Sequence, residues 1–116
     1  ELIDRQKIAD CYTSSLSNIL ITPTIKSDRV SAWAQYTIRV KDRDNLHLKL
    51  KKEGIPTSIF YPIPLHFQEC FKYLNYKQND LPISEKVCNE VLSIPMNAFL
   101  THSELNYIIS KIKKSI

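Results

Sequence analysis

Glycine is almost absent from this sequence: Gly54 is the single glycine among 116 residues. The glycine-rich fingerprint of dinucleotide-binding folds and the P-loop of nucleoside-triphosphate enzymes both need several glycines, because the backbone there closely approaches the phosphates. Neither kind of phosphate site can therefore be built from this chain.

Long apolar runs and paired cysteines are also missing. No stretch approaches the roughly 18 apolar residues of a membrane span, and the opening residues "ELIDRQKIADCY" contain neither the apolar core nor the cleavage site of a signal peptide. The odd number of cysteines predicts a reduced, cytoplasmic chain with buried thiols and no membrane partner. The cysteines show no metal-ligand spacing, and the histidines are too scattered for a zinc site, so no bound metal is expected. These residues are Cys11, Cys70, Cys88, His47, His66 and His102.

The net charge of +4 comes largely from two lysine-rich runs, "KLKKEG" and "KIKKSI". Such runs are typical of the solvated faces of helices. Nucleic-acid binding through these lysines is an alternative. Binding to phosphates weakens as salt is added, so an affinity that does not depend on salt would exclude this alternative. No aromatic residues alternate with the lysines as in many nucleic-acid binders, and no nucleic-acid partner is predicted.

Fourfold spacing of apolar residues predicts several helices. The first runs from Glu1 to about Asn18 with Ile8, Tyr12 and Leu16 on one face. The last begins at a Thr101–Glu104 capping box and buries a stripe of Leu105, Ile108, Ile109 and Ile112. Between them we predict a helix ending near Gly54, capped by Asp42 or Asp44, and another from Pro82 to just before Pro95. For the segment that ends near Gly54 a strand is the alternative, because Leu46, Leu48 and Leu50 alternate as residues of a strand do.

Two strands complete the expected fold. Residues 32–40 ("AWAQYTIRV") are rich in aromatic and β-branched residues, and alternation places Ala34, Tyr36, Ile38 and Val40 on the core face. Residues 57–61 ("TSIFY") form a second, short strand, and "HFQECFKYL" a turn or two of helix. The sum is an α+β fold in which helices pack on one face of a small sheet, forming one domain over residues 1–116.

Three of the six prolines lie close together in "GIPTSIFYPIPLHFQ". Proline fixes its own φ and keeps the preceding residue extended, so Pro62 and Pro64 hold this segment open without strand pairing. Such a segment can present Tyr61 outside the core. The alternative is a rigid crossover whose aromatic rings pack in the core, with His66 at the surface or capping a helix.

Four blocks resemble one known family in order along the chain. They lie in "SAWAQYTIRV", in "LKKEGIPTSIFYPIPLHFQ", which contains two of them, and in "LPISEKVCNEVLSIPMNAFL". Together these are similar to the C-terminal part of the pyridoxal-phosphate-dependent sugar aminotransferases of the DegT/DnrJ/EryC1/StrS family. That family has a strand of this type, a helix ending in Gly-Ile, an H-Y-P-x-P-L-H-x-Q block and an L-P-x-(A/S)-E element before the last helix. The resemblance implies the small domain of a fold-type I transferase.

The resemblance also implies a site. In the family the H-Y-P block lies near the sugar-nucleotide substrate at the subunit interface, which assigns substrate contact to Tyr61 and Pro62. Phe60 replaces the family's histidine and cannot form its hydrogen bonds. His66 matches the end of the block, where positioning is expected rather than chemistry. The implied substrates are nucleotide-linked 3-keto sugars for surface polysaccharides.

The cofactor-binding part of such an enzyme is not in this sequence. Family members hold pyridoxal phosphate on a lysine of a large N-terminal domain, and the lysines here lie in solvated runs unsuited to that chemistry. The start at Glu1, within a predicted helix, suggests a piece of a longer protein. We therefore expect an inert C-terminal domain that works with the large domain of the same chain, in a homodimer, without catalytic residues of its own.

A second hypothesis comes from a different class of protein. The chain could be a stand-alone protein-binding α/β module that keeps the fold without the enzyme. Phe60 supports this interpretation, because it adds apolar surface where an enzyme would be polar.

Overall fold

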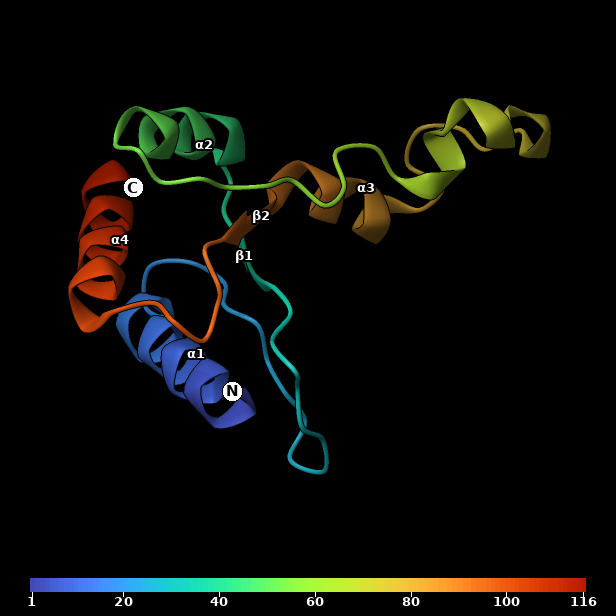
Figure 1. Cartoon of the computed structure of the whole chain (residues 1–116). Helices are drawn as coiled ribbons and strands as arrows, with labels where there is room; N and C mark the ends of the chain where they lie inside the picture. Colours follow the sequence, from blue (N-terminus) through green and yellow to red (C-terminus); the bar gives the residue numbers. More distant parts are fainter.

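Three helices surround a short two-stranded sheet in the computed structural model, which describes residues 1–116. These are α1 (Leu2–Leu16), α2 (Arg43–Lys52) and α4 (His102–Ser115). Helix α4 contacts both α1 and α2, and the three gather at one end of the molecule (Figure 1). The predicted α+β class, a small sheet covered by helices, is confirmed.

The first and last helices form as their sequences predict. In α1, Ile8, Tyr12 and Leu16 are buried, which confirms the predicted stripe. At the start of α4, the Thr101 side chain accepts a hydrogen bond from the amide of Glu104, and the Glu104 carboxylate accepts one from the amide of Thr101. This reciprocal capping satisfies two amides that a helix start leaves unpaired.

The ambiguous leucine-rich segment is the helix α2. Leu46 and Leu50 are buried whereas Leu48 is 57% exposed, as expected for helical and not for strand periodicity. Asp42 stands at the N-cap position but its side chain makes no capping hydrogen bond, so the predicted cap is wrong in that detail. Gly54 follows with a φ of 75°, the left-handed conformation that glycine adopts without strain.

The sheet consists of β1 (Tyr36–Arg39) and β2 (Val91–Ile94), which run antiparallel. Ile38 pairs with Leu92, and both are fully buried. Thr37 and Ser93 face each other and share a hydroxyl hydrogen bond of 2.8 Å. An isolated bridge between Ser58 and Ser93 extends the sheet beyond β2, and a second one between Ile21 and Arg39 extends it beyond β1.

The structure corrects three predictions about the strands. The strand expected over residues 32–40 is confined to β1, where buried Tyr36 and Ile38 confirm the predicted core face. Before the strand the expected faces are reversed, because Trp33 is buried and Ala34 is exposed. Residues 57–61 contribute only the Ser58 bridge. The helix expected to reach Pro95 stops earlier, because α3 (Pro82–Glu90) gives way directly to β2. Pairing with β1 there overrides the local helical spacing, as tertiary context often does.

An aromatic cluster joins α1 to the sheet. The ring centroid of Tyr36 lies 5.0 Å from that of Tyr12 and 5.5 Å from that of Trp33. The Tyr12 hydroxyl donates to the carbonyl of Pro95 at 2.8 Å, and the Tyr36 hydroxyl lies 2.6 Å from the Thr13 hydroxyl. Each buried phenol thus has a polar partner, which removes the cost of burying an unpaired hydroxyl.

Residues 60–89, hereafter the arm, project away from this helical core (Figure 1). The arm contains two short 3₁₀ helices, η1 (Leu65–Phe67) and η2 (Glu69–Leu74), followed by most of α3. Between Ile55 and Glu90, His66 is the single buried residue. The radius of gyration is 15.7 Å, compared with about 13 Å for a compact domain of this length. The arm therefore has no apolar core of its own.

Candidate functional site

The proline segment carries the chain from the core into the arm. Ser58 and Ser93 exchange backbone hydrogen bonds of 3.0 and 2.7 Å, so the segment is fastened to β2 at this point. Beyond Ser58, Pro62 and Pro64 lack amide donors and keep the backbone extended, and no strand continues. The prolines thus mark where the chain leaves the sheet and enters the arm.

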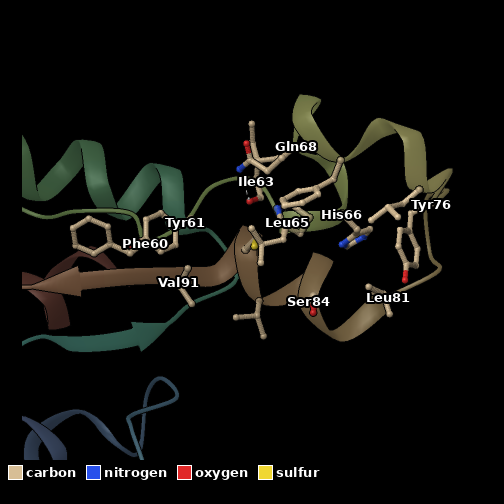
Figure 2. Close-up of a pocket in the computed structure, with 15 residues that line it drawn as sticks. Phe60, Tyr61, Ile63, Leu65, His66, Gln68, Tyr76, Leu81, Ser84 and Val91 are labelled. Carbon is tan, nitrogen blue, oxygen red and sulfur yellow. Dashed lines mark hydrogen bonds between the residues drawn. The ribbon is translucent and has the colours of Figure 1, made fainter.

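Phe60 and Tyr61 lie at this exit, beside β2 (Figure 2). Their ring centroids are 5.5 Å apart in an edge-on arrangement, and their exposed fractions are 40% and 69%. Pro62 next to them is also exposed. The structure therefore agrees with a segment that presents Tyr61 outward, and the alternative in which these rings pack in the core is wrong.

A groove of about 830 Å³ runs along the arm from Phe60 and Tyr61 to Tyr76 (Figure 2). Most of the side chains that line it are apolar, and none belongs to aspartate, glutamate, lysine or arginine. A diphosphate needs cationic side chains or converging amide groups, so this groove is unsuited to the charged part of a nucleotide sugar. Its chemistry suits an apolar protein surface instead.

His66 lies inside the arm and not at its surface. Its side chain is 4% exposed, and its Nε2 atom lies 3.4 Å from a carboxylate oxygen of Glu85. The rings of Phe67 and Tyr76 pack beside the imidazole, with centroids 4.2 and 5.6 Å away. The interpretation of His66 as a surface or capping residue is therefore wrong. The imidazole joins the beginning of the arm to its return leg.

Glu85 is fixed by the backbone of the loop that precedes α3. Its two carboxylate oxygens accept hydrogen bonds from the amide of Asn79 at 2.8 Å and from the amide of Leu81 at 3.1 Å. The hydrogen bond from the amide of Asn79 lowers the pKa of Glu85 the most, whereas desolvation of the carboxylate raises this pKa. The amide of Leu81 and the nearby His66 lower it further. Glu85 is thus held as an acceptor by the amides of the loop, with the imidazole of His66 3.4 Å away.

Arg43 anchors the base of the arm. This arginine is 6% exposed, and its guanidinium donates to the carbonyls of Cys88 at 3.0 Å and Val91 at 2.9 Å. A cation at the end of a helix satisfies carbonyls that lack a helical partner. Arg39 adds an ion pair with Glu90 at 2.8 Å. The junction between α3 and β2 is therefore held by two arginines.

None of the lysines has the environment that a Schiff-base lysine requires. Every lysine is exposed except Lys111, which pairs with Glu53 at 3.0 Å. The hydrogen bond to Glu53 raises the pKa of Lys111, whereas a nucleophilic lysine needs a lowered pKa. The residues described here therefore do not fit a covalent site for pyridoxal phosphate.

The cysteines are less buried than expected. Cys11 and Cys88 are half-buried, and Cys70 in η2 is exposed, so the prediction of buried thiols fails at Cys70.

No helix has the length and apolar character needed to cross a membrane.

Sequence reasoning missed Arg43 and Glu85. Arg43 stands in the polar stretch "KDRDNL", where nothing local distinguishes it from a solvated cation. Glu85 was visible in principle, since it is the glutamate of the "LPISE" block that resembles the family's L-P-x-(A/S)-E element.

Comparison with known proteins decides the family. The sequence profile of the DegT/DnrJ/EryC1/StrS aminotransferase family matches residues 2–113. The chain belongs to this family. It is 39% identical over 112 residues to a "Pleiotropic regulatory protein" of Geobacillus stearothermophilus, covering 93% of this chain and 30% of the relative. It is 37% identical over 109 residues to the UDP-2-acetamido-2-deoxy-3-oxo-D-glucuronate aminotransferase of Pseudomonas aeruginosa, again covering 93% and 30%.

Solved structures of the family contain the same fold. A DegT/DnrJ/EryC1/StrS aminotransferase from Brucella abortus superposes with a TM-score of 0.89 at 36% identity, covering 98% of this chain and 31% of that one. The DesV enzyme of S. venezuelae, solved with a ketimine intermediate, superposes with a TM-score of 0.89 at 27% identity, covering 95% and 30%. The chain thus spans about three tenths of the length of the relatives that it matches.

Proposed function

We propose that this chain is the C-terminal small domain of a cytoplasmic, pyridoxal-phosphate-dependent aminotransferase that acts on a nucleotide-linked keto sugar. The observation that carries the proposal is the family match over residues 2–113 together with relatives about three times as long. The relative from Pseudomonas aeruginosa, whose name specifies a UDP-linked 3-oxo sugar acid, supports a substrate of this class. As the family resemblance implies, the product would serve surface-polysaccharide synthesis.

In this proposal the large domain of the same polypeptide holds the cofactor, and the isolated chain is inert. The exposed or ion-paired state of all the lysines supports this division. When bound, pyridoxal phosphate supplies an electron sink for the carbanion of the substrate. The residues of this chain bind and orient the sugar and keep water from the reaction.

Tyr61, Pro62 and Phe60 are the proposed substrate contacts. Tyr61 combines an exposed ring with a hydroxyl that can donate to or accept from a sugar hydroxyl. His66 acts at a distance by holding the arm beside Glu85, because its side chain is buried within the arm and 3.4 Å from that carboxylate. The uncharged groove of the arm fits the proposed packing against the large domain or the second subunit of a homodimer.

The same groove favours a second candidate function. An uncharged, largely apolar groove with Phe60 at its entrance is also what a stand-alone protein-binding module would offer. In that case the chain would keep the family's fold without its chemistry.

An absorbance spectrum with added pyridoxal phosphate separates the two candidates. The measurement uses the isolated chain and, beside it, the full-length product of the gene that encodes it. We expect a yellow full-length protein whose colour borohydride bleaches, beside a colourless short chain. If both proteins remain colourless, the aminotransferase proposal fails and the binding module takes its place. A yellow short chain would overturn the assignment of the cofactor to the large domain.

A further inference from the structure

A cleft of about 520 Å³ lies at the edge of the sheet opposite the proline segment. Because β2 occupies one side of β1, the isolated bridge between Arg39 and Ile21 lies on the other side. The bridge between Ser93 and Ser58 similarly marks the outer side of β2, where the chain leaves for the arm. Ile21 and Arg39 line the cleft, and none of its lining residues lines the groove of the arm. The cleft is therefore separate from the proposed substrate contacts.

Cationic side chains line this cleft, whereas the groove of the arm has none. Cations outnumber carboxylates four to two. The resulting positive field is concentrated inside a cleft whose walls have a low dielectric constant. The charged residues are Arg39, Lys41, Lys49, Lys86, Asp42 and Glu90.

The contacts of these cations show which of them remain available. Arg39 donates to Glu90 at 2.8 and 3.1 Å, so these two opposite charges cancel. Lys49 donates to a backbone carbonyl of α4 at 3.3 Å, which holds its ammonium beside the cleft without neutralising it. Lys86 is 68% exposed, with its Nζ atom 4.0 Å from Glu90, and Lys41 is exposed without an ion pair. Even with one lysine offset by the remaining carboxylate, two positive charges stay uncompensated.

Part of the wall is apolar. Leu46 is a buried lining residue, and Ile19 and Ile21 are 39% and 54% exposed. A phosphate group carries up to two negative charges and three acceptor oxygens, which matches two uncompensated ammonium groups better than the single charge of a carboxylate does. The isoleucines suit an apolar group attached to that phosphate.

We propose that this cleft binds a phosphate group attached to an apolar moiety, with Lys41 and Lys86 contacting the phosphate and Ile19 and Ile21 contacting the moiety. Lysines supply the charge here, so no glycine-rich loop is needed. A soluble phosphate ester and the headgroup of an anionic phospholipid offer the same chemistry. A lipid would overturn the prediction that this chain has no membrane partner. The inference goes beyond the proposed function, because none of these residues belongs to the proposed substrate contacts.

Titration calorimetry of the full-length protein with inorganic pyrophosphate tests the cleft. Pyridoxal phosphate and UDP are present at saturation, so that the phosphate positions of the proposed active site are occupied. We expect Lys41→Glu to weaken pyrophosphate binding about tenfold, because a repulsion replaces an attraction. Lys26→Glu is the matched control: Lys26 is exposed, has no ion pair and does not line the cleft. Its affinity should change less than about twofold, because salt screens a distant charge.

Flotation with lipid vesicles separates the two sources of phosphate. A phospholipid source predicts binding to mixed phosphatidylcholine–phosphatidylglycerol vesicles in preference to pure phosphatidylcholine vesicles. Lys41→Glu should weaken that binding and Lys26→Glu should not. Ile21→Ser should weaken it as well, because an exposed apolar side chain beside lysines can enter the lipid interface. A soluble source predicts pyrophosphate binding without preferential binding to the anionic vesicles.

Two results would overturn the phosphate site. One is a wild-type protein that binds neither pyrophosphate nor the anionic vesicles. The other is equal weakening by Lys41→Glu and Lys26→Glu, because the net charge of the protein would then explain the binding. Unchanged melting temperatures of the variants exclude unfolding as the cause of lost binding. Neither result depends on whether the protein takes up pyridoxal phosphate, so the failure of this inference and the failure of the proposed function are distinguishable.

Discussion

The Nε2 atom of His66 and a carboxylate oxygen of Glu85 lie 3.4 Å apart and join the two legs of the arm. His66 stands in η1 and Glu85 in the first turn of α3, so the pair closes a loop that otherwise lacks a core. Because Glu85 also binds the amides of Asn79 and Leu81, a single carboxylate organises the return of the chain.

Acid should open the arm. The pKa of Glu85 lies below its ordinary value of 4.5, so its hydrogen bonds stabilise the arm above that pH and are lost as the pH falls through the lowered pKa. Hydrogen exchange by NMR, corrected for intrinsic rates, should show loss of protection at Asn79 and Leu81 as the pH is lowered below 4.5.

The Glu85→Gln variant provides the control for this titration. An amide cannot ionise and accepts with one oxygen only, so protection at Asn79 and Leu81 should be weaker and independent of pH in this range. Ile109, in the interior of α4, serves as a reference amide. Acid-dependent loss that persists in Glu85→Gln would show that another group controls the arm.

Arg43→Ala should destabilise the chain by about 2–4 kcal/mol, because the carbonyls of Cys88 and Val91 lose a charged donor at a buried position. Urea denaturation measures the change. Arg29→Ala is the matched control, since the side chain of Arg29 is 68% exposed, and its effect should lie within about 0.5 kcal/mol. Equal effects of the two substitutions would contradict the anchoring role of Arg43.

Trp33 is the single tryptophan, so its fluorescence reports on the turn before β1, where the φ of Trp33 is 48° and strained for a residue with a Cβ atom. Gln6→Ala removes the acceptor of the indole N–H, and Arg5→Ala removes the donor to the Trp33 carbonyl. Both variants should shift the emission maximum of Trp33 to longer wavelength, because a less restrained indole is more exposed to water. Iodide should also quench the fluorescence of both variants more strongly than that of the wild-type protein. Lys7→Ala, on the exposed side of the same helix, should leave the spectrum unchanged.

Tyr61→Ala in the full-length protein should raise the KM for the sugar nucleotide about threefold to tenfold and leave the KM for the amino donor unchanged. Stability should change little, because the Tyr61 side chain is 69% exposed. Tyr73→Ala is the matched control: Tyr73 is 73% exposed on the same arm and does not line the groove. A similar rise in KM for both variants would refute a direct contact by Tyr61.

Local signals predicted the parts of this fold that local interactions determine. The capping box of Thr101 and Glu104 and the stripe of Ile8, Tyr12 and Leu16 each involve residues within a few positions of one another. The prolines similarly predicted an open segment with Tyr61 exposed, because their effect on the backbone is intrinsic.

The remaining features depend on partners distant in sequence. Val91 and Leu92 continue a helical spacing, yet they form a strand because Arg39 and Ile38, more than fifty positions earlier, pair with them. The burial of His66 depends on Glu85, and the conformation of Trp33 depends on α1. The spacing of apolar residues along the chain does not reveal such distant contacts. The candidate substrate contacts Phe60, Tyr61 and Pro62 therefore rest on the resemblance to a family and stay a prediction.

Helix α3 ends at Glu90 and β2 begins at Val91, with no residue between them to absorb a change in length. A single inserted residue at this junction would shift β2 by one position, turning Leu92 away from Ile38 and bringing Val91 into its place. Evolution and protein engineering can therefore vary the exposed side chains of the arm, but the junction itself must conserve its length to the residue.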